Sequence, residues 1–367
     1  MTPFDFRPRT RVLFGAGDFS RLGEVARESG ATKCLLVADR GMVERGYAQE
    51  ATRTLKARRI EVCGFHDFEA GPTVPMIDVG AAFAGPLNVN LIVALGGGSS
   101  LDCAKAINFV ITNGGSIRDY WGYGKASKPM LPMIAVPTTA GTGSEAQSTT
   151  VIVDPETSVR MACGDHKASF RAAILDPKLT VSQPRALTMA SGWDAIAHAV
   201  ETLVSTRQTA LSECFSRSAW RLLNSNFERT IKDPSDLAAR GGMLIGAHFG
   251  GLAVENSNLG AAHACAAPLT AHYKVPHGVA VGLMLAVVVE WNCPAAGRQY
   301  DELTPDLVRR LRDLADVSGL PQSLRDASIP EEALPRLAEE AASQWVGRFN
   351  PRAFDAAAAL EIYRCAY

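Results

Sequence analysis

The sequence predicts an α/β N-terminal domain built on a parallel sheet, followed by an all-α domain. Short runs of continuous apolar residues alternate with helical patterns through roughly the first 180 residues, which is typical of βαβ units whose sheet is covered on both faces. Beyond Asp176-Pro177 and Pro184, strand patterns almost disappear and helical periodicity dominates. We therefore expect two domains, residues 1–183 and 184–367.

Apolar runs bounded by glycine or proline are the predicted strands, and helical patterns lie between them. The predicted strands are Lys33–Ala38, Ile60–Phe65, Val89–Leu95 and Met133–Val136. The first-half helices are expected at Phe19–Ser29, Ala48–Arg58, Val74–Phe83 and Leu101–Thr112. The second-half helices are expected at Ser191–Glu201, Ala210–Asn224, Asp236–Ala253, Glu302–Ser318, Glu331–Gln344 and Pro351–Tyr363. This alternation favours a nucleotide-binding type of sheet in the first domain.

Charge and composition exclude several classes of partner. The chain has 37 Lys+Arg and 38 Asp+Glu, so its net charge of −1 offers no general attraction to nucleic acid or to an anionic membrane. Its eight cysteines are scattered without a CxxC pair, which fits reduced thiols in a cytosol. The N-terminus lacks an apolar signal region, and the most apolar late run, Gly278–Val289, is too short to cross a bilayer. We expect a cytoplasmic protein with no nucleic-acid or membrane partner.

A glycine-rich turn joins the third predicted strand to the helix that follows it. Gly96, Gly97 and Gly98 precede Ser99 at this junction. Glycine lets the backbone approach a ligand closely, and a helix N-terminus attracts a pyrophosphate. A tight turn without any ligand explains three glycines equally well, and the pattern is not GxGxxG. The turn is therefore a candidate cofactor-binding element.

Two further segments follow predicted strands, where ligands bind in open α/β sheets. Residues 137–145 form a loop rich in small hydroxyl side chains, which can bind phosphate or ribose, although an ordinary surface loop is the alternative. Asp39 directly follows the predicted strand Lys33–Ala38. A carboxylate at this position can accept hydrogen bonds from an adenosine ribose. It would repel a 2′-phosphate and so favours NAD over NADP. A helix N-cap is the competing explanation for Asp39.

Four side chains in the second half have the chemistry of a metal site. Asp194 and His198 are four positions apart, so they lie on one face of a predicted helix. His263 and His277 supply two more imidazoles. One carboxylate and three imidazoles suit Fe(II) or Zn(II), with room for a substrate oxygen.

Each of these four residues also has an ordinary structural explanation. An Asp-x3-His pair can be a local hydrogen bond, His263 can be a core histidine, and His277 can begin a helix after a proline. Sequence spacing does not establish that they converge. The metal site is therefore a hypothesis that depends on the tertiary fold.

Taken together, the ordered segments resemble the iron-containing (group III) alcohol dehydrogenase family, through nearly the whole chain. The matching segments are FGAG at 14–17, GGGSSLDCAKA at 96–106, VPTTAGTGSE at 136–145, AILDPKL at 173–179, GWDAIAHAVE at 192–201, LGAAHACAAPL at 259–269, VPHGVAVGL at 275–283 and Asn350-Pro351-Arg352. Each segment is weak alone, whereas the ordered series is specific. The resemblance implies a dinucleotide-binding α/β domain, an all-helical metal-binding domain, and an active site between them.

The resemblance also implies roles for individual residues. It implies that Asp194, His198, His263 and His277 bind the metal and serve catalysis. The positions implied to line the NAD(P) site are Asp39, Gly97, Gly98, Ser99, Asp102, Thr138, Thr139, Thr142 and Leu179. The family is often dimeric or larger, so a homodimer or higher homo-oligomer is expected.

Two positions depart from the family pattern. Relatives usually carry a second histidine four residues after the first, where this chain has Ala267. That histidine lies near the nicotinamide in relatives, so the proton route and the usual substrate are in doubt here. Gly71 replaces an asparagine that often lies near the adenine. The metal-ligating set is unaffected.

The implied activity is a metal-dependent, NAD(P)-linked alcohol dehydrogenase or aldehyde or ketone reductase. The metal, Fe(II) or alternatively Zn(II), would act as a Lewis acid on the oxygen of a small alcohol or aldehyde, while hydride passes to or from the nicotinamide. Three alternatives stay open: a dehydroquinate-synthase-like lyase, a maleylacetate-reductase-like oxo-acid reductase, and a non-catalytic nucleotide-binding protein. The physiological substrate and the choice between iron and zinc cannot be predicted from the sequence.

Overall fold

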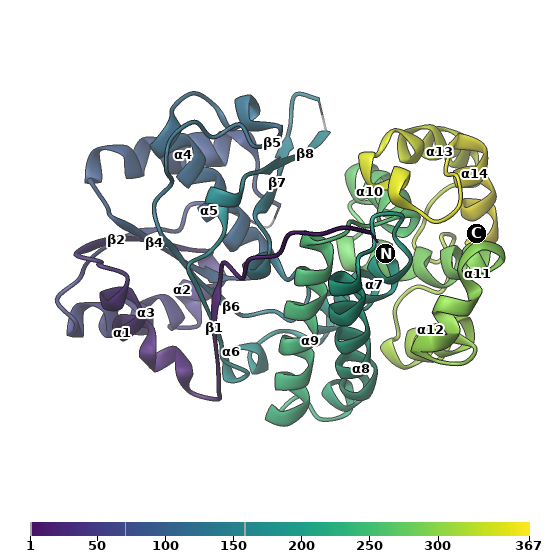
Figure 1. The fold of residues 1–367 in the computed structure, drawn as a ribbon, viewed down its shortest axis with the longest axis horizontal. Helices are drawn as coiled ribbons and strands as arrows, with labels where there is room; N and C mark the ends of the chain where they lie inside the picture. Colours follow the sequence, from purple (N-terminus) through teal and green to yellow (C-terminus); the bar gives the residue numbers. More distant parts are fainter. Residues whose placement is uncertain (1, 70, 158) are drawn as a thin grey trace. The chain divides into compact units, whose positions relative to one another are not determined.

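The computed structural model describes residues 2–69, 71–157 and 159–367, and the chain forms two compact units. The α/β unit comprises Phe6–Thr139 and Ser144–Ser182. The helical unit comprises Gln183–Tyr367 together with Ala140–Gly143 and the N-terminal segment that ends at Asp5. Figure 1 shows a sheet with helices in the first unit and helices α7–α14, coloured teal through green to yellow, in the second. The predicted fold class is confirmed, while the division into domains at residues 183 and 184 stays a prediction.

The α/β unit is built on a six-stranded parallel sheet with the order β1-β9-β6-β4-β2-β3. Four of its strands coincide with the predicted apolar runs. They are β2 Lys33–Ala38, β3 Glu61–Phe65, β4 Leu91–Gly96 and β6 Met133–Pro137. Every residue of β4 and β6 is buried, as a parallel sheet covered on both faces requires.

Several strands were not predicted from the sequence. The strands β1 Arg11–Phe14 and β9 Ala172–Leu175 have four residues each and complete one side of the sheet. A second sheet has the order β5-β8-β7, with β5 Gly122–Tyr123, β7 Thr149–Asp154 and β8 Val159–Gly164. In β7 buried residues alternate with half-buried ones, so this strand lacks the continuous apolar run by which the others were recognised.

Helices of the α/β unit pack on both faces of its sheet. They are α1 Leu22–Glu28, α2 Arg40–Glu44, α3 Tyr47–Ala57, α4 Val74–Ala84, α5 Gly98–Asn113 and α6 Lys178–Val181. Leu91, Val93 and Leu95 of β4 share one hydrophobic core with residues of α1 and α3. The intervening Ile92 and Ala94 are also fully buried. Both faces of β4 are therefore covered, which leaves the carboxyl ends of the strands as the place for polar side chains.

In the described residues, the helical unit has eight α-helices around its own core. They are α7 Arg185–Val204, α8 Ala210–Lys232, α9 Leu237–Glu255, α10 Ala261–Tyr273, α11 His277–Leu303, α12 Leu307–Ser318, α13 Leu334–Ser343 and α14 Ala356–Cys365. The core includes Trp193 and Val200 of α7 and Met284 of α11.

Several predicted helix boundaries in this unit are wrong. The helix expected to end at Asn224 continues to Lys232. Glu302 belongs to the end of α11, and α12 begins only at Leu307. Between them Thr304 is extended, as the residue before Pro305 must be, and Asp306 caps α12 by accepting a hydrogen bond from the amide of Arg309. The last helix begins at Ala356 rather than Pro351, because Asp355 caps it through the amide of Ala358.

Two helices among the described residues are long and apolar enough to cross a membrane, namely α9 and α11. The protein buries 61% of the most apolar window of α9 and 50% of that of α11. The apolar run near residue 278 is therefore part of a longer helix than expected, since α11 has 27 residues. Both helices contribute side chains to the core of the helical unit, as core helices do.

Candidate metal centre and cofactor-binding residues

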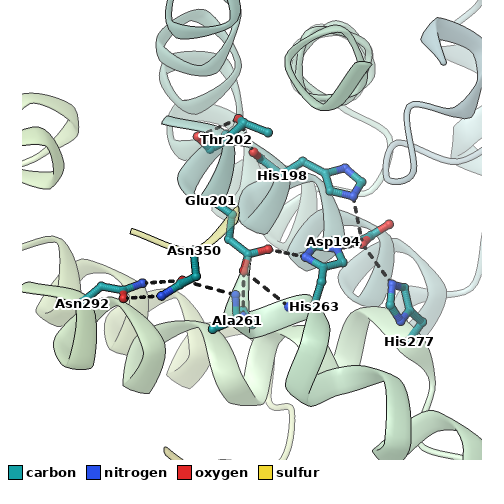
Figure 2. Close-up of polar contacts among 11 residues, drawn as sticks. Asp194, His198, Glu201, Thr202, Ala261, His263, His277, Asn292 and Asn350 are labelled. Carbon is teal, nitrogen blue, oxygen red and sulfur yellow. Dashed lines mark hydrogen bonds and ion pairs between the residues drawn. The ribbon is translucent and has the colours of Figure 1, made fainter. Parts of the chain in front are cut away.

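Three helices of the helical unit bring the four predicted metal ligands together (Figure 2). Asp194 and His198 lie one turn apart on α7, His263 lies in the first turn of α10, and His277 is the first residue of α11. The side chains of Asp194, His198 and His263 are 6%, 7% and 6% exposed, whereas that of His277 is 30% exposed. The cluster is thus open on the side of His277.

A single carboxylate oxygen is the common point of the cluster. The Oδ1 atom of Asp194 lies 3.5 Å from Nε2 of His198, 3.4 Å from Nε2 of His263 and 3.7 Å from Nε2 of His277. Ligand atoms of Asp194, His263 and His277 all lie within 4.8 Å of one another. Metal–ligand bonds of about 2.1 Å in a tetrahedral site place two ligand atoms about 3.4 Å apart. The donor types and spacing of these three residues fit one divalent cation, with His198 joined to the group through its 3.5 Å distance to Asp194, and cation binding stays a prediction.

Electrostatics couple the carboxylate to the imidazoles. Burial works against the charged form of Asp194, but the imidazoles, His198 foremost, hold the pKa of this carboxyl well below its usual range. Burial also works against the charged form of His263, but the carboxylates of Glu201 and Asp194 outweigh it and raise the pKa of this ring to about 9. Asp194 thus keeps a negative charge at the centre of the cluster, and a cation that bound Nε2 of His263 would displace a proton from that ring.

A fifth polar side chain, Glu201, belongs to this cluster and was not predicted from the sequence. Its carboxylate accepts hydrogen bonds from Nδ1 of His263 and from the backbone amide of Ala262. Glu201 is only 4% exposed. A pattern for it did exist, because Asp194, His198 and Glu201 lie at positions i, i+4 and i+7 and so share one face of a buried helix.

In the α/β unit the glycine-rich turn lies where the sequence places it. Gly97 is the N-cap residue of α5, and Gly98 and Ser99 begin the helix. The hydroxyl of Ser99 accepts a hydrogen bond from the amide of Gly71 at 3.1 Å. Gly96 has a φ of +143°, and a Cβ there would lie 2.3 Å from Oγ of Ser100, so only glycine fits this turn.

The two carboxylates assigned to the cofactor also have structural partners. Asp39 is the N-cap of α2, accepting a hydrogen bond from the amide of Met42 at 3.1 Å, and its other oxygen accepts one from the hydroxyl of Ser100. Asp39 is therefore a helix N-cap, as the alternative explanation predicted. Asp102 accepts hydrogen bonds from the hydroxyl of Ser144 and the amide of Val151, and burial raises its pKa. Cofactor binding by either carboxylate stays a prediction.

The remaining predicted cofactor residues have different environments. Thr138 is fully buried at the end of β6, where its amide donates to the carbonyl of Gly96. Thr139 is half-buried and lies beside Gly97. A Cβ added at Gly97 would lie 3.3 Å from the methyl group of Thr139.

The last two predicted cofactor residues lie in different units. Thr142 belongs to the helical unit, since residues 140–143 group with it. Leu179 on α6 is 3% exposed and packs into the core of the α/β unit. Their contact with a cofactor stays a prediction.

Ala267 and Gly71 mark the two departures from the family pattern. Ala267 is half-buried on α10, one turn after His263, so a methyl group stands where an imidazole would project from the same face. Gly71 has a φ of +73°, and its amide donates the hydrogen bond to the hydroxyl of Ser99.

Comparison with known proteins identifies the class to which this fold and site belong. A family model described as "Iron-containing alcohol dehydrogenase" matches residues 8–177, and one described as "Fe-containing alcohol dehydrogenase family, C-terminal" matches residues 188–367. An NAD-dependent methanol dehydrogenase of Bacillus methanolicus is 30% identical over 368 residues, covering 96% of each chain.

Solved structures agree with these matches. A 1,3-propanediol oxidoreductase superposes with a TM-score of 0.95 at 32% identity and full coverage of both chains. A sulfoacetaldehyde reductase from Bifidobacterium kashiwanohense, solved in complex with NAD+, superposes with a TM-score of 0.91 at 27% identity, covering 100% of this chain and 99% of that one. The fold and sequence thus define an oxidoreductase that acts on CH–OH groups. The chain belongs to the iron-containing alcohol dehydrogenase family.

Proposed function

We propose that Asp194, His198, His263 and His277 bind one divalent cation, Fe(II), and that the enzyme interconverts a small alcohol with its aldehyde or ketone, using NAD. The observation that carries this proposal is the position of three imidazole Nε2 atoms within 3.4 to 3.7 Å of one buried carboxylate oxygen. Zn(II) is the alternative ion, because the same donor set suits it.

The chain's own residues would position the reactants and shape their electrostatics. When bound, the metal polarises the substrate C–O group and the nicotinamide carries the hydride. The negative charge of Asp194 offsets part of the cation's charge and so moderates its acidity. The partial exposure of His277, at 30%, favours approach of the substrate from that side. Ala267 supplies no titratable group, so any proton exchange needs another residue or water.

NAD is favoured over NADP by the charge of Asp39. This carboxylate follows β2, where an adenosine ribose binds in dinucleotide-binding sheets, and it would repel a 2′-phosphate. Each carboxylate oxygen can accept more than one hydrogen bond, so the contacts with Met42 and Ser100 leave capacity for a ribose hydroxyl.

The substrate class is taken from the relatives, whose names specify methanol and 1,3-propanediol. We expect a small alcohol or aldehyde, and we propose a homodimer or higher homo-oligomer in the cytoplasm. Light scattering of the purified protein would measure the oligomeric state.

A cofactor and substrate screen tests the proposed activity. The metal-free protein is loaded with Fe(II) or Zn(II), and NADH and NADPH are followed in parallel with a panel of alcohols, aldehydes and oxo-acids. Net oxidation or reduction of NAD(H) with an alcohol or aldehyde supports the proposal. Turnover of a substrate without net change in NADH would indicate the lyase alternative, and activity confined to oxo-acids would indicate the maleylacetate-reductase-like one.

A further inference from the structure

Glu201 contacts a proposed metal ligand and the start of the helix that carries it. We propose that Glu201 is a positioning residue, which orients His263 and fixes the proton on its Nδ1 atom so that Nε2 is available to the metal. This inference rests on the proposed metal site. It assigns a role to a side chain outside the four-ligand set.

The two carboxylate oxygens of Glu201 have separate partners (Figure 2). Oε2 contacts Nδ1 of His263. Oε1 accepts a hydrogen bond from the amide of Ala262 at 2.7 Å and a longer one from the amide of His263 at 3.4 Å. One carboxylate therefore holds both the ring and the backbone of the same residue, which restricts the position of the ring more than either contact alone.

The carboxylate of Glu201 lies at the N-terminus of α10, where it accepts hydrogen bonds from backbone amides. Ala262 and His263 are the second and third residues of α10, whose N-terminus carries partial positive charge. With the carboxylate of Glu201 as the acceptor, Nδ1 of His263 is the donor in this contact. In the neutral imidazole the lone pair is then on Nε2, the atom that lies 3.4 Å from Oδ1 of Asp194.

The residues at the start of α10 leave room for the carboxylate of Glu201. Gly260 precedes α10 and has no side chain with which to cap it; a Cβ there would lie 3.2 Å from Oε1 of Glu201 and 3.1 Å from Oδ1 of Asn350. Asn350 in turn accepts a hydrogen bond from the amide of Ala261 at 3.3 Å and is paired with Asn292. Two side chains thus cap the start of α10, but the contact with the His263 ring described here is made by Glu201.

This division of roles provides a matched control. Replacing Glu201 removes both an α10 cap and the ring contact, whereas replacing Asn350 removes a cap and leaves the contact between Glu201 and His263 in place. A purely structural role for Glu201 would make the two replacements equivalent. A positioning role predicts that only the Glu201 replacement changes the metal site.

The experiment measures Zn(II) affinity of the metal-free full-length chain by competition with a chromophoric chelator at constant pH, together with the melting temperature. The variants are Glu201→Gln, Glu201→Asp, Asn350→Ala and His263→Ala. We expect Glu201→Gln to weaken Zn(II) binding about 10- to 100-fold, the usual cost of losing the partner of a metal-bound histidine. Glu201→Asp should recover part of that loss, and Asn350→Ala should stay within about threefold of the wild-type affinity while lowering the melting temperature.

The outcomes separate this inference from the proposed function. Wild-type affinity in Glu201→Gln, or an equal loss in Asn350→Ala, would overturn the positioning role while leaving the four-ligand site intact. If Glu201→Gln does not fold, the same comparison is made with Glu201→Asp, for which wild-type affinity overturns the role and a selective loss supports it. Unchanged Zn(II) binding in His263→Ala would overturn the metal site itself, and this inference with it.

Discussion

Gly278 lies against Ala190 so closely that a Cβ at position 278 would be 1.8 Å from the Ala190 carbonyl oxygen. This places the first turn of α11 directly on the backbone of α7, one turn before Asp194. Since His277 precedes Gly278, the same approach sets the imidazole of His277 beside the carboxylate of Asp194, at 3.7 Å. The absence of a side chain at position 278 thus lets His277 reach Asp194.

Replacing this glycine should damage stability and metal binding together. Gly278→Ala forces the two helices apart, and we expect a loss of about 1–3 kcal/mol in the free energy of unfolding with weaker Zn(II) binding. Thermal unfolding and chelator competition measure the two effects. Gly297→Ala is the control on the same helix, because a Cβ there meets only Cβ of Cys293 at 4.0 Å. A Gly278→Ala variant as stable as Gly297→Ala would contradict the argument.

Removing an imidazole from the cluster should abolish metal content and turnover in parallel. For His263→Ala we expect a loss of metal affinity greater than about 100-fold, since even the outer partners of such ligands contribute about 10- to 100-fold. Elemental analysis and NADH absorbance measure the two quantities. His272→Ala is the control, because this histidine lies on the same helix but pairs with Glu340. Full metal and activity in His263→Ala would disprove its assignment as a ligand.

Neutralising Asp39 should shift the coenzyme preference toward NADP. Asp39→Asn retains an N-cap for α2 while removing the charge that would repel a 2′-phosphate. Like charges about 4 Å apart in water repel by about 1 kcal/mol, so we expect the ratio of kcat/KM for NADP to that for NAD to rise about fivefold. Glu28→Gln, which removes an exposed carboxylate paired with Arg11, is the control. An unchanged ratio would show that Asp39 does not set the preference between NAD and NADP.

Buried and exposed cysteines should differ in their reactivity toward a thiol-labelling reagent. Burial raises the pKa of Cys34 to about 12 and that of Cys163 to about 12. The raised pKa leaves almost no thiolate at pH 8, so both should resist iodoacetamide, whereas Cys214 and Cys365 are exposed and should react. Mass spectrometry of labelled peptides from the native protein measures this. Rapid labelling of Cys34 in the folded chain would contradict its burial in β2.

Much of the fold could be predicted because hydrophobic periodicity is a local property. The continuous apolar runs of β2, β4 and β6 distinguish buried parallel strands from the helices beside them. Strand β1 escaped prediction because only one of its four residues is buried, so it has no continuous apolar run. Its place is decided by pairing with β9, which in turn pairs with β6. The boundary between α11 and α12 depended on Pro305 and the cap at Asp306 rather than on periodicity.

The sequence by itself determined which residue types could carry the chemistry: a carboxylate and an imidazole one turn apart, two further imidazoles, and glycines before a helix. Only the tertiary structure decided that Nε2 of His263, 69 positions from Asp194, lies 3.4 Å from its carboxylate, and that Glu201 holds the opposite side of the same ring. The physical reason is that sequence patterns relate only residues that are close together along the chain. Side-chain periodicity relates residues within a turn or two of one helix, whereas the meeting of α7, α10 and α11 depends on close packing between helices, as at Gly278 and Ala190.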